Sequence, residues 1–127
     1  MYLRYLPQKK KREPTPTIDV LEEEAGSLEE EGKVAEALSF REKALFKLVH
    51  MHGVFEPQVR DAAEQLVLLC NTTAMSSLHE EGKAKSAVML LKKAERLTSM
   101  DGPIADRDLR LRLRAVTLNN LGCFYKQ

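Results

Sequence analysis

The sequence contains little of what marks several large classes of protein. It has no tryptophan, and aromatic residues make up only 6% of its 127 residues. No apolar run approaches the roughly 18 residues that a membrane-spanning helix needs, so we expect no membrane protein. The formal net charge of +1 gives no strong field for attracting nucleic acid or anionic surfaces. With 43% apolar and 31% charged residues, the composition favours a helix-rich soluble protein.

Features of enzymes and metal proteins are also missing. The two cysteines, Cys70 and Cys123, lie far apart without C-x-x-C spacing, which predicts reduced core thiols in a cytoplasmic protein. His50 and His52 are two positions apart and would point to different sides of a helix, so they do not form a metal pair. No glycine-rich phosphate loop or nucleophile-base motif is present. We therefore expect no enzyme, no catalytic residue, no metal, no cofactor and no small-molecule substrate.

Proline is scarce except at the start of the chain. Three of the five prolines fall in residues 1–16, together with the basic run at residues 9–12. This composition predicts a flexible basic leader over residues 1–16. Three roles stay open for the basic run: binding in cis to the chain's own acidic residues, binding in trans to an acidic partner, and acting as a nuclear import signal.

From residue 17 onward the pattern predicts an all-α fold of about five helices. Thr17 is an N-cap candidate for the first helix, which would end at Gly32, and Pro57 suits the first turn of the third. The apolar run at residues 66–70 indicates that this third helix is buried on more than one side. The expected helices run from 17 to 32, 34 to 52, 56 to 82, 84 to 100, and from about 106 to the end.

In the fifth helix, Leu109, Leu113 and Val116 mark one predicted apolar face. The arginines Arg107, Arg110 and Arg114 mark the opposite face, and Arg112 adds to the same basic patch. No aromatic residues for base stacking accompany this patch, so we do not expect nucleic-acid binding. The arginines are interpreted as a solubilising surface.

An internal repeat is the most informative feature of the sequence. The segment at residues 27–33 recurs 50 positions later at residues 77–83, and the two differ only where Glu29 is replaced by His79. The register continues into the next helix, where alanines recur at the same offset. Glycine at a helix end adopts the left-handed conformation that reverses the chain, and alanines let two helices approach closely. The repeat therefore predicts two helical hairpins. The shared positions are Gly32, Ala37 and Ala44, matched by Gly82, Ala87 and Ala94.

The spacing of these glycines and alanines resembles the second half of the tetratricopeptide repeat (TPR) motif. The segment at residues 117–127 resembles its first helix, with Leu118, Leu121, Gly122 and Tyr125 at the large, large, small and aromatic positions. Asn119 and Asn120 resemble the kinesin-light-chain subtype, whose units are similarly lengthened. Two positions depart from the motif: Arg41 stands where an aromatic residue is usual, and Met75 where a small one is.

The resemblance implies a right-handed solenoid of stacked antiparallel hairpins. Its parts would be a hairpin at 17–53, a second at 56–101, and an orphan first helix at 104–127. Counting 47 residues from Gly82 puts the next turn glycine past the carboxyl terminus, so the third repeat would be cut mid-motif. The chain would then be either a piece of a longer array or end in a helix whose apolar face meets something else.

The resemblance also implies binding of an extended peptide or partner segment in a concave groove lined by the first helix of each pair. Asn119 and Asn120 are the strongest candidates, because each side-chain amide can donate to and accept from a peptide backbone. Clamping of a terminal carboxylate is not expected, because acidic residues occupy the corresponding face. For the acidic residues a merely solvated helix face remains the alternative. The other candidate partner-binding residues are Glu22, Glu23, Thr72, Thr73, Ser76, His79 and Lys126.

A second function stays open beside peptide binding. The chain would instead be an architectural subunit of a ciliary, centriolar or motor-associated assembly, docking through its helix faces or forming a homo-oligomer. Both hypotheses predict a protein or peptide partner and a cytoplasmic location, with a cytoskeletal or ciliary site as a narrower possibility.

Overall fold

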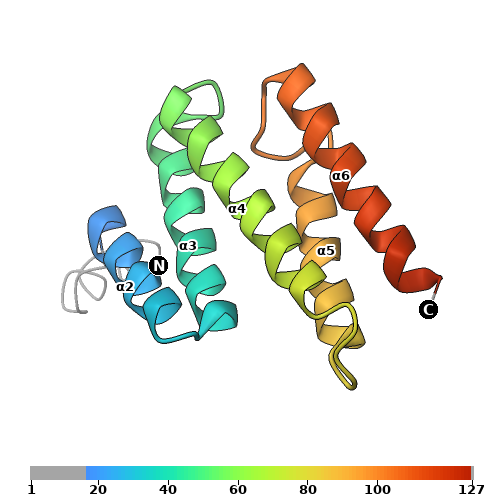
Figure 1. Cartoon of the computed structure of the whole chain (residues 1–127). Coiled ribbons are helices and arrows are strands. Elements are labelled where there is room, and N and C mark those ends of the chain that lie inside the picture. Colours follow the sequence, from blue (N-terminus) through green and yellow to red (C-terminus); the bar gives the residue numbers. More distant parts are fainter. Residues whose placement is uncertain (1–16, 127) are drawn as a thin grey trace, which may run out of the picture.

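A computed structural model describes residues 17–126, and all regular structure in this range is helical (Figure 1). The all-α class predicted from the sequence is confirmed for these residues. The predicted basic leader, residues 1–16, lies outside the described residues. The helices are α2 (Ile18–Glu30), α3 (Val34–His52), α4 (Pro57–Ser76), α5 (Ala84–Leu97) and α6 (Arg107–Tyr125).

The helices begin where capping residues predict. The Thr17 hydroxyl accepts a hydrogen bond from the Val20 amide at 3.3 Å, at the start of α2. The Asp106 carboxylate accepts one from the Leu109 amide at 3.1 Å, at the start of α6. Pro57 is the first residue of α4, where its missing N–H costs nothing. The bounds predicted for the second helix match α3.

Two helices end earlier than expected. Helix α4 ends at Ser76, not at residue 82, and α5 ends at Leu97, not at residue 100. At both ends a hydroxyl bonds to a carbonyl of the last turn, and the chain then continues in turns instead of helix. The Ser76 hydroxyl donates to the Thr73 carbonyl, and the Thr98 hydroxyl donates to the Ala94 carbonyl at 2.9 Å.

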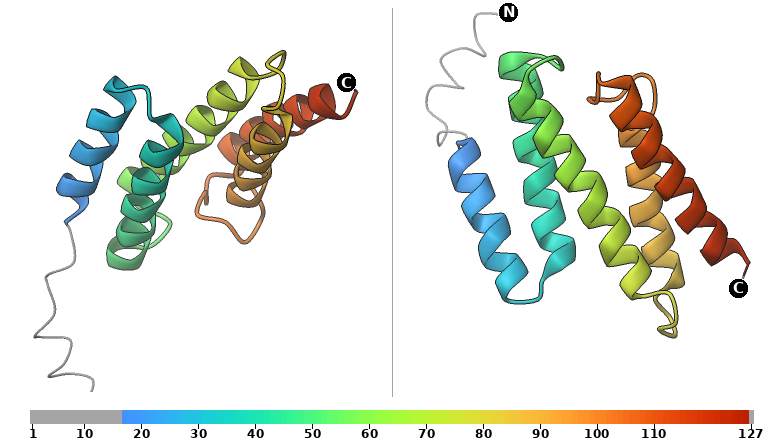
Figure 2. Two further views of the ribbon diagram at one scale, coloured as in Figure 1. Left: turned by 90° about the horizontal axis from the view of Figure 1, so that it is seen from below. Right: turned by 45° about the horizontal axis from the view of Figure 1, so that its top comes forward.

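Successive helices run antiparallel and form two layers (Figures 1 and 2). Helices α4 and α6 lie side by side in front, with α3 and α5 behind them, and α2 lies at the edge beside α3. Helix α4 contacts α3, α5 and α6, whereas α2 contacts only α3 among the described helices. Helix α4 therefore lies at the centre of the packing, and α2 is positioned by α3 alone.

The main core runs through the interfaces between α3, α4, α5 and α6. It includes Leu45, Leu66 and Val67, each at most 1% exposed. The predicted burial of α4 on more than one side is confirmed, because its buried residues contact three neighbouring helices. The repeat alanines Ala37, Ala44, Ala87 and Ala94 are all buried, as expected for close helix packing.

The turn glycines behave as predicted. Gly32 and Gly82 have φ of 80° and 79°, in the left-handed region that side chains disfavour. Both follow helices that end within a few residues, and both precede a new helix. The repeated glycines therefore share one conformation, although Gly32 follows the end of α2 by two residues and Gly82 follows the end of α4 by six.

The apolar face expected on α6 was partly wrong. Leu109 and Leu113 are buried, but Val116 is 48% exposed. Thr117 is buried in its place, with its hydroxyl donating to the Leu113 carbonyl at 2.8 Å. The core therefore follows an i, i+4, i+8 spacing, which a hydroxyl can join because its hydrogen bond is satisfied within the helix.

The cysteines are both free. Cys70 is fully buried, and burial raises the pKa of its thiol to about 11. Cys123 is only half-buried, so the prediction of a core thiol holds for Cys70 alone. None of the described helices combines the length and the apolar character needed to cross a membrane.

Gly102 supports a testable prediction about the turn between α5 and α6. A Cβ atom at this position would lie 2.6 Å from the Leu97 carbonyl oxygen, a backbone atom that cannot easily move. We expect Gly102→Ala to lower the free energy of unfolding by about 1–3 kcal/mol, measured by urea denaturation.

Gly26, in the interior of α2, offers the matched control. A Cβ atom there meets nothing within 4 Å, so Gly26→Ala should stabilise the protein by about 0.5–1 kcal/mol. Equal effects of the two substitutions would contradict the steric explanation.

Candidate functional site: a groove between α2 and α4

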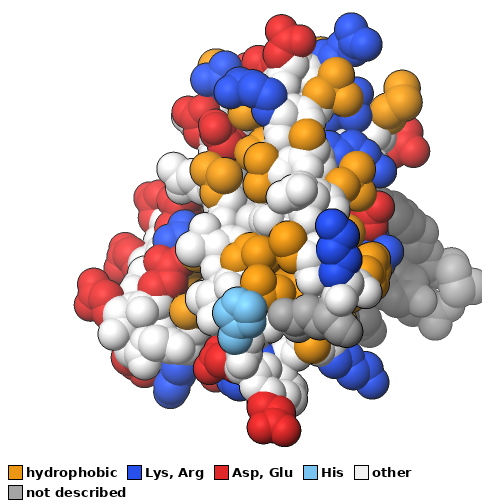
Figure 3. Space-filling model, turned by 45° about the vertical axis from the view of Figure 1, so that its right-hand side comes forward, with side chains coloured by type: hydrophobic (Ala, Val, Ile, Leu, Met, Phe, Trp, Pro, Cys, Tyr) orange, Lys and Arg blue, Asp and Glu red, His pale blue; other side chains and the backbone are white. Residues whose placement is uncertain are grey.

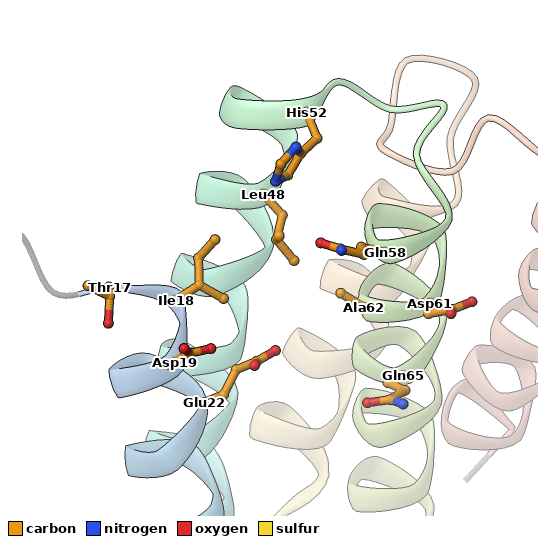
Figure 4. A pocket seen from close by; sticks show the side chains of 10 residues that line it. All are labelled: Thr17, Ile18, Asp19, Glu22, Leu48, His52, Gln58, Asp61, Ala62 and Gln65. Atoms are coloured by element: carbon orange, nitrogen blue, oxygen red, sulfur yellow. The ribbon is translucent and has the colours of Figure 1, made fainter.

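The first helices of the two hairpins do not touch each other. No close contact joins α2 to α4, and a cavity of about 490 Å³ lies between them with α3 behind. We refer to this cavity as the α2–α4 groove (Figure 4). It is lined by Thr17, Ile18, Asp19, Glu22, Leu48, His52, Gln58, Asp61, Ala62 and Gln65.

The two walls of the groove differ in chemistry. From α2, Glu22 extends toward α4, and Ile18 lies close to Leu48 of α3 (Figure 4). From α4, the amides of Gln58 and Gln65 extend back toward α2. These glutamines lie two helical turns apart, so they share one face of α4. The groove thus combines an apolar part with a carboxylate wall and an amide wall.

Negative charge in the groove comes mainly from α2. Asp19 and Glu22 form no ion pair with any side chain of residues 17–126. The Asp61 carboxylate instead turns away from the groove (Figure 4), and it lies 3.3 Å from Arg60. After Glu29, Glu22 also raises the pKa of Arg41 through its negative charge. The groove therefore presents two carboxylates, neither of them in a direct ion pair, to any cationic ligand that enters it.

An ion pair fixes α2 against α3. The Arg41 guanidinium donates two hydrogen bonds to the Glu29 carboxylate, at 2.6 and 2.8 Å. These bonds lower the pKa of Glu29, and hydrogen bonding to Glu29 raises the pKa of Arg41. The side chains are 28% and 26% exposed, so solvent screens part of their attraction. The unusual arginine noted in the sequence therefore holds one wall of the groove in place.

This pair predicts a specific acid sensitivity. Because the folded-state pKa of Glu29 is lowered, its stabilisation is present above the ordinary value of 4.5 and is lost as the pH falls through the folded-state pKa. We expect Glu29→Gln to cost about 0.5–1 kcal/mol at pH 7, and this difference from the wild type to shrink below pH 4.5. Urea denaturation across pH 3 to 7 measures both.

Glu24, an exposed glutamate on the same helix without an ion pair to a described residue, gives the control. Glu24→Gln should change the free energy of unfolding by less than about 0.5 kcal/mol across this pH range. If the difference in free energy of unfolding between Glu29→Gln and the wild type does not vary with pH, the ion pair is not its source.

Helices α4 and α6, in contrast to α2 and α4, are joined by a network of polar side chains. The Asn71 amide donates to the Thr117 hydroxyl at 3.0 Å and to the Val67 carbonyl at 3.0 Å. Asn120 on α6 donates to the Asn71 side-chain oxygen at 2.8 Å. Asn71 is 5% exposed, so these bonds form within the packed interface. The amide of Asn120, expected to bind a peptide, bonds within the protein.

Removing Asn71 tests this network. Asn71→Ala leaves the partly buried Asn120 amide without its acceptor, so we expect a loss of about 1–3 kcal/mol in the free energy of unfolding. The exposed neighbour Thr72 supplies the control, since Thr72→Ala should cost less than about 0.5 kcal/mol. Similar losses for both variants in urea denaturation would contradict a stabilising role for the network.

Other residues predicted to bind a partner are dispersed over the structure. Glu22 lines the α2–α4 groove, but Glu23 is exposed outside its lining. Along α4, Thr72 is exposed, and Thr73 lines a separate cavity with the starts of α3 and α5. The structure does not bring these residues into one site with α6. The remaining candidates Asn119, Ser76, His79 and Lys126 are exposed.

Two of the arginines expected to form a solubilising surface make internal hydrogen bonds. Arg114 donates to the Glu95 carbonyl at 2.9 Å, and Arg110 donates to the Thr98 carbonyl at 3.3 Å. These carbonyls lie at the carboxyl end of α5, where positive charge is favourable. For Arg110 and Arg114 the surface interpretation was wrong, because α6 packs beside that helix end.

Sequence reasoning missed the amide wall of the groove. Gln58, Ala62 and Gln65 have the spacing of one helix face, which the sequence alone contains. Nothing in the sequence, however, shows that this face of α4 lies open toward α2. The groove depends on the tertiary placement of α2.

Comparison with known proteins gives no relative: no protein-family model, curated protein or solved structure matches the chain. Within residues 17–126, no group of three histidine, cysteine, aspartate or glutamate side chains is placed to hold a metal ion. The candidate site is therefore defined by the geometry of the α2–α4 groove alone.

Proposed function

We propose that the protein is an interaction scaffold of the tetratricopeptide type that binds an extended, basic segment of a protein partner in the α2–α4 groove. The observation that carries this proposal is the groove itself, an open cavity with two carboxylates that form no direct ion pair on one wall and two amides on the other. The sequence repeat and the buried alanines support the tetratricopeptide assignment.

The amide wall suits an extended backbone. Gln58 and Gln65 are seven residues apart on α4, a rise of about 10 Å along the helix. An extended segment of the polyproline II type advances about 3.1 Å per residue and repeats every three residues, so the two amides match peptide groups about three residues apart on one face. Each glutamine amide can donate to and accept from such a group, which satisfies backbone polar atoms that otherwise lose their water.

The carboxylate wall selects for positive charge. A lysine or arginine of the bound segment would reach Asp19 or Glu22, while its aliphatic stem packs on Ile18 and Leu48. Because the carboxylates are partly solvent-exposed, salt should weaken this contribution. The basic run at residues 9–12 of the chain has the same chemistry and would compete with a partner for the groove.

A binding assay with labelled 12-residue peptides tests the proposal. Peptides with a central Lys-x-x-Arg should bind the full chain more tightly than their Gln-x-x-Gln counterparts. We expect the double variant Asp19→Asn, Glu22→Gln to weaken binding of the basic peptide about tenfold and to remove most of the difference between the peptides. Fluorescence polarisation at 50 and 300 mM salt measures both effects.

Two control variants separate the groove from general electrostatics. Glu23→Gln with Glu24→Gln removes the same amount of charge from α2 outside the groove lining, and it should leave binding nearly unchanged. Asn120→Ala should also leave binding unchanged if the ligand site lies between α2 and α4. Equal losses in both α2 double variants would overturn the assignment to the groove.

A further inference from the structure

Helix α6 has a second apolar face that residues 17–126 leave partly exposed, with the Tyr125 hydroxyl at its end hydrogen-bonded to Lys92 of α5. Leu111, Leu118 and Tyr125 are 42%, 44% and 63% exposed, and they recur every seven residues. Exposed Ala115 and half-exposed Gly122 lie between them, so the five residues follow the alternating spacing of four and three that forms one continuous stripe. The stripe lies opposite the core residues Leu109, Leu113, Thr117 and Leu121.

Figure 3 brings the α6 side of the molecule forward and shows hydrophobic side chains gathered on this face, with uncharged polar and basic side chains beside them. A helix at the surface of a protein normally has one apolar face. The presence of two on α6 indicates that this helix packs against something in addition to α4 and α5.

Gly122 is not explained by packing within the chain. It lies inside α6, where glycine weakens a helix, and a Cβ atom there would meet nothing within 4 Å. A glycine on an exposed helix face does allow another helix to approach closely. The small residues Ala115 and Gly122 alternate with the large residues Leu111 and Leu118 along the stripe.

We propose that α6 pairs antiparallel with α6 of a second copy of this chain. The stripe uses two positions of the seven-residue repeat, one with large residues and one with small residues. In an antiparallel pair of helices related by a two-fold axis, the first position of one copy faces the second position of the other copy. Leu111 then packs over Gly122 of the second copy, and Leu118 over Ala115 of the second copy. Each leucine meets a small residue, and the same register places Tyr125 over Asp108 of the second copy, so the two leucines are complementary to the two small residues, as a two-fold interface requires.

Charge at the ends of α6 selects the antiparallel arrangement. Asp108 and Lys126 are eighteen residues apart, which is five full turns, so both lie on the same edge of the stripe. Neither forms an ion pair with another described side chain. Antiparallel pairing brings Asp108 of each copy beside Lys126 of the other, whereas parallel pairing would place like charges together.

The contact is limited to one helix from each copy, about 28 Å long. An interface of this size forms a weak, reversible dimer, not an obligate one. Helix α2 lies at the opposite edge of the molecule from α6 (Figure 1), so the dimer leaves both α2–α4 grooves open. The inference does not depend on peptide binding.

Light scattering of the full chain over a range of concentrations tests the pairing. The apparent mass should rise from the monomer value of 14.4 kDa toward twice that value. Leu118→Glu should keep the protein monomeric throughout. Leu68→Glu is the matched control, because Leu68 is 45% exposed on α4 outside the stripe, and this variant should dimerise like the wild type. A wild type that stays monomeric would overturn the proposal, and so would an equal loss of dimerisation in Leu118→Glu and Leu68→Glu.

Charge reversal tests the direction of the pair. Asp108→Lys and Lys126→Asp each place two like-charge contacts in the dimer, so each variant alone should dimerise at least tenfold more weakly than the wild type. An equal mixture of the two should recover dimerisation, because the mixed pair restores opposite charges at both ends. Circular dichroism confirms that each variant is folded. A mixture that stays as weak as its components would show that the helices do not pair antiparallel in this register.

Discussion

Helix α4 packs against α3, α5 and α6, and the placement of every other element depends on these three contacts. Its buried residues are small or branched apolar side chains, with Asn71 as the one polar exception among them. Because Asn71 is satisfied by Val67, Thr117 and Asn120, the α4–α6 interface carries no buried polar group without a partner. Hydrogen bonding then fixes the relative position of α4 and α6 more closely than apolar packing alone would.

The same helix is left uncovered on the side that faces α2. No counterpart of the Asn71 network joins α2 to α4, and α2 is tied instead to α3 through the Glu29 and Arg41 side chains. The space between α2 and α4 is therefore open, whereas the interface between α4 and α6 is closed. This difference between two otherwise repeated units places the candidate binding site at one end of the molecule.

Much of the fold was predictable because local signals and tertiary packing agree. Thr17, Pro57 and Asp106 start helices, and Gly32 and Gly82 reverse the chain, as their chemistry requires. The ends of α4 and α5 were placed too late, because the prediction took the glycine or proline that follows as the helix end. The chain instead forms turns over residues 77–82 and 98–102 before it reaches the next helix.

The candidate site was harder to predict than the fold. Glu22, a predicted partner-binding residue, lines the α2–α4 groove, but Gln58 and Gln65 gained significance only from the gap between α2 and α4. Asn120 was expected at a ligand surface because its sequence resembles a binding subtype, yet its amide bonds to Asn71. Arg110 and Arg114 were interpreted as surface charge, because the sequence does not show that α6 packs beside the carboxyl end of α5, which they contact.

The single contact of α2 with α3 has a consequence for how the protein opens. An element held by one neighbour can detach without disrupting the rest, so α2 should unfold as a cooperative unit of its own in amide hydrogen exchange. One wall of the groove would then be transiently absent in the free protein. A bound segment that bridges α2 and α4 would suppress this local unfolding, which couples occupancy of the groove to the order of its own wall.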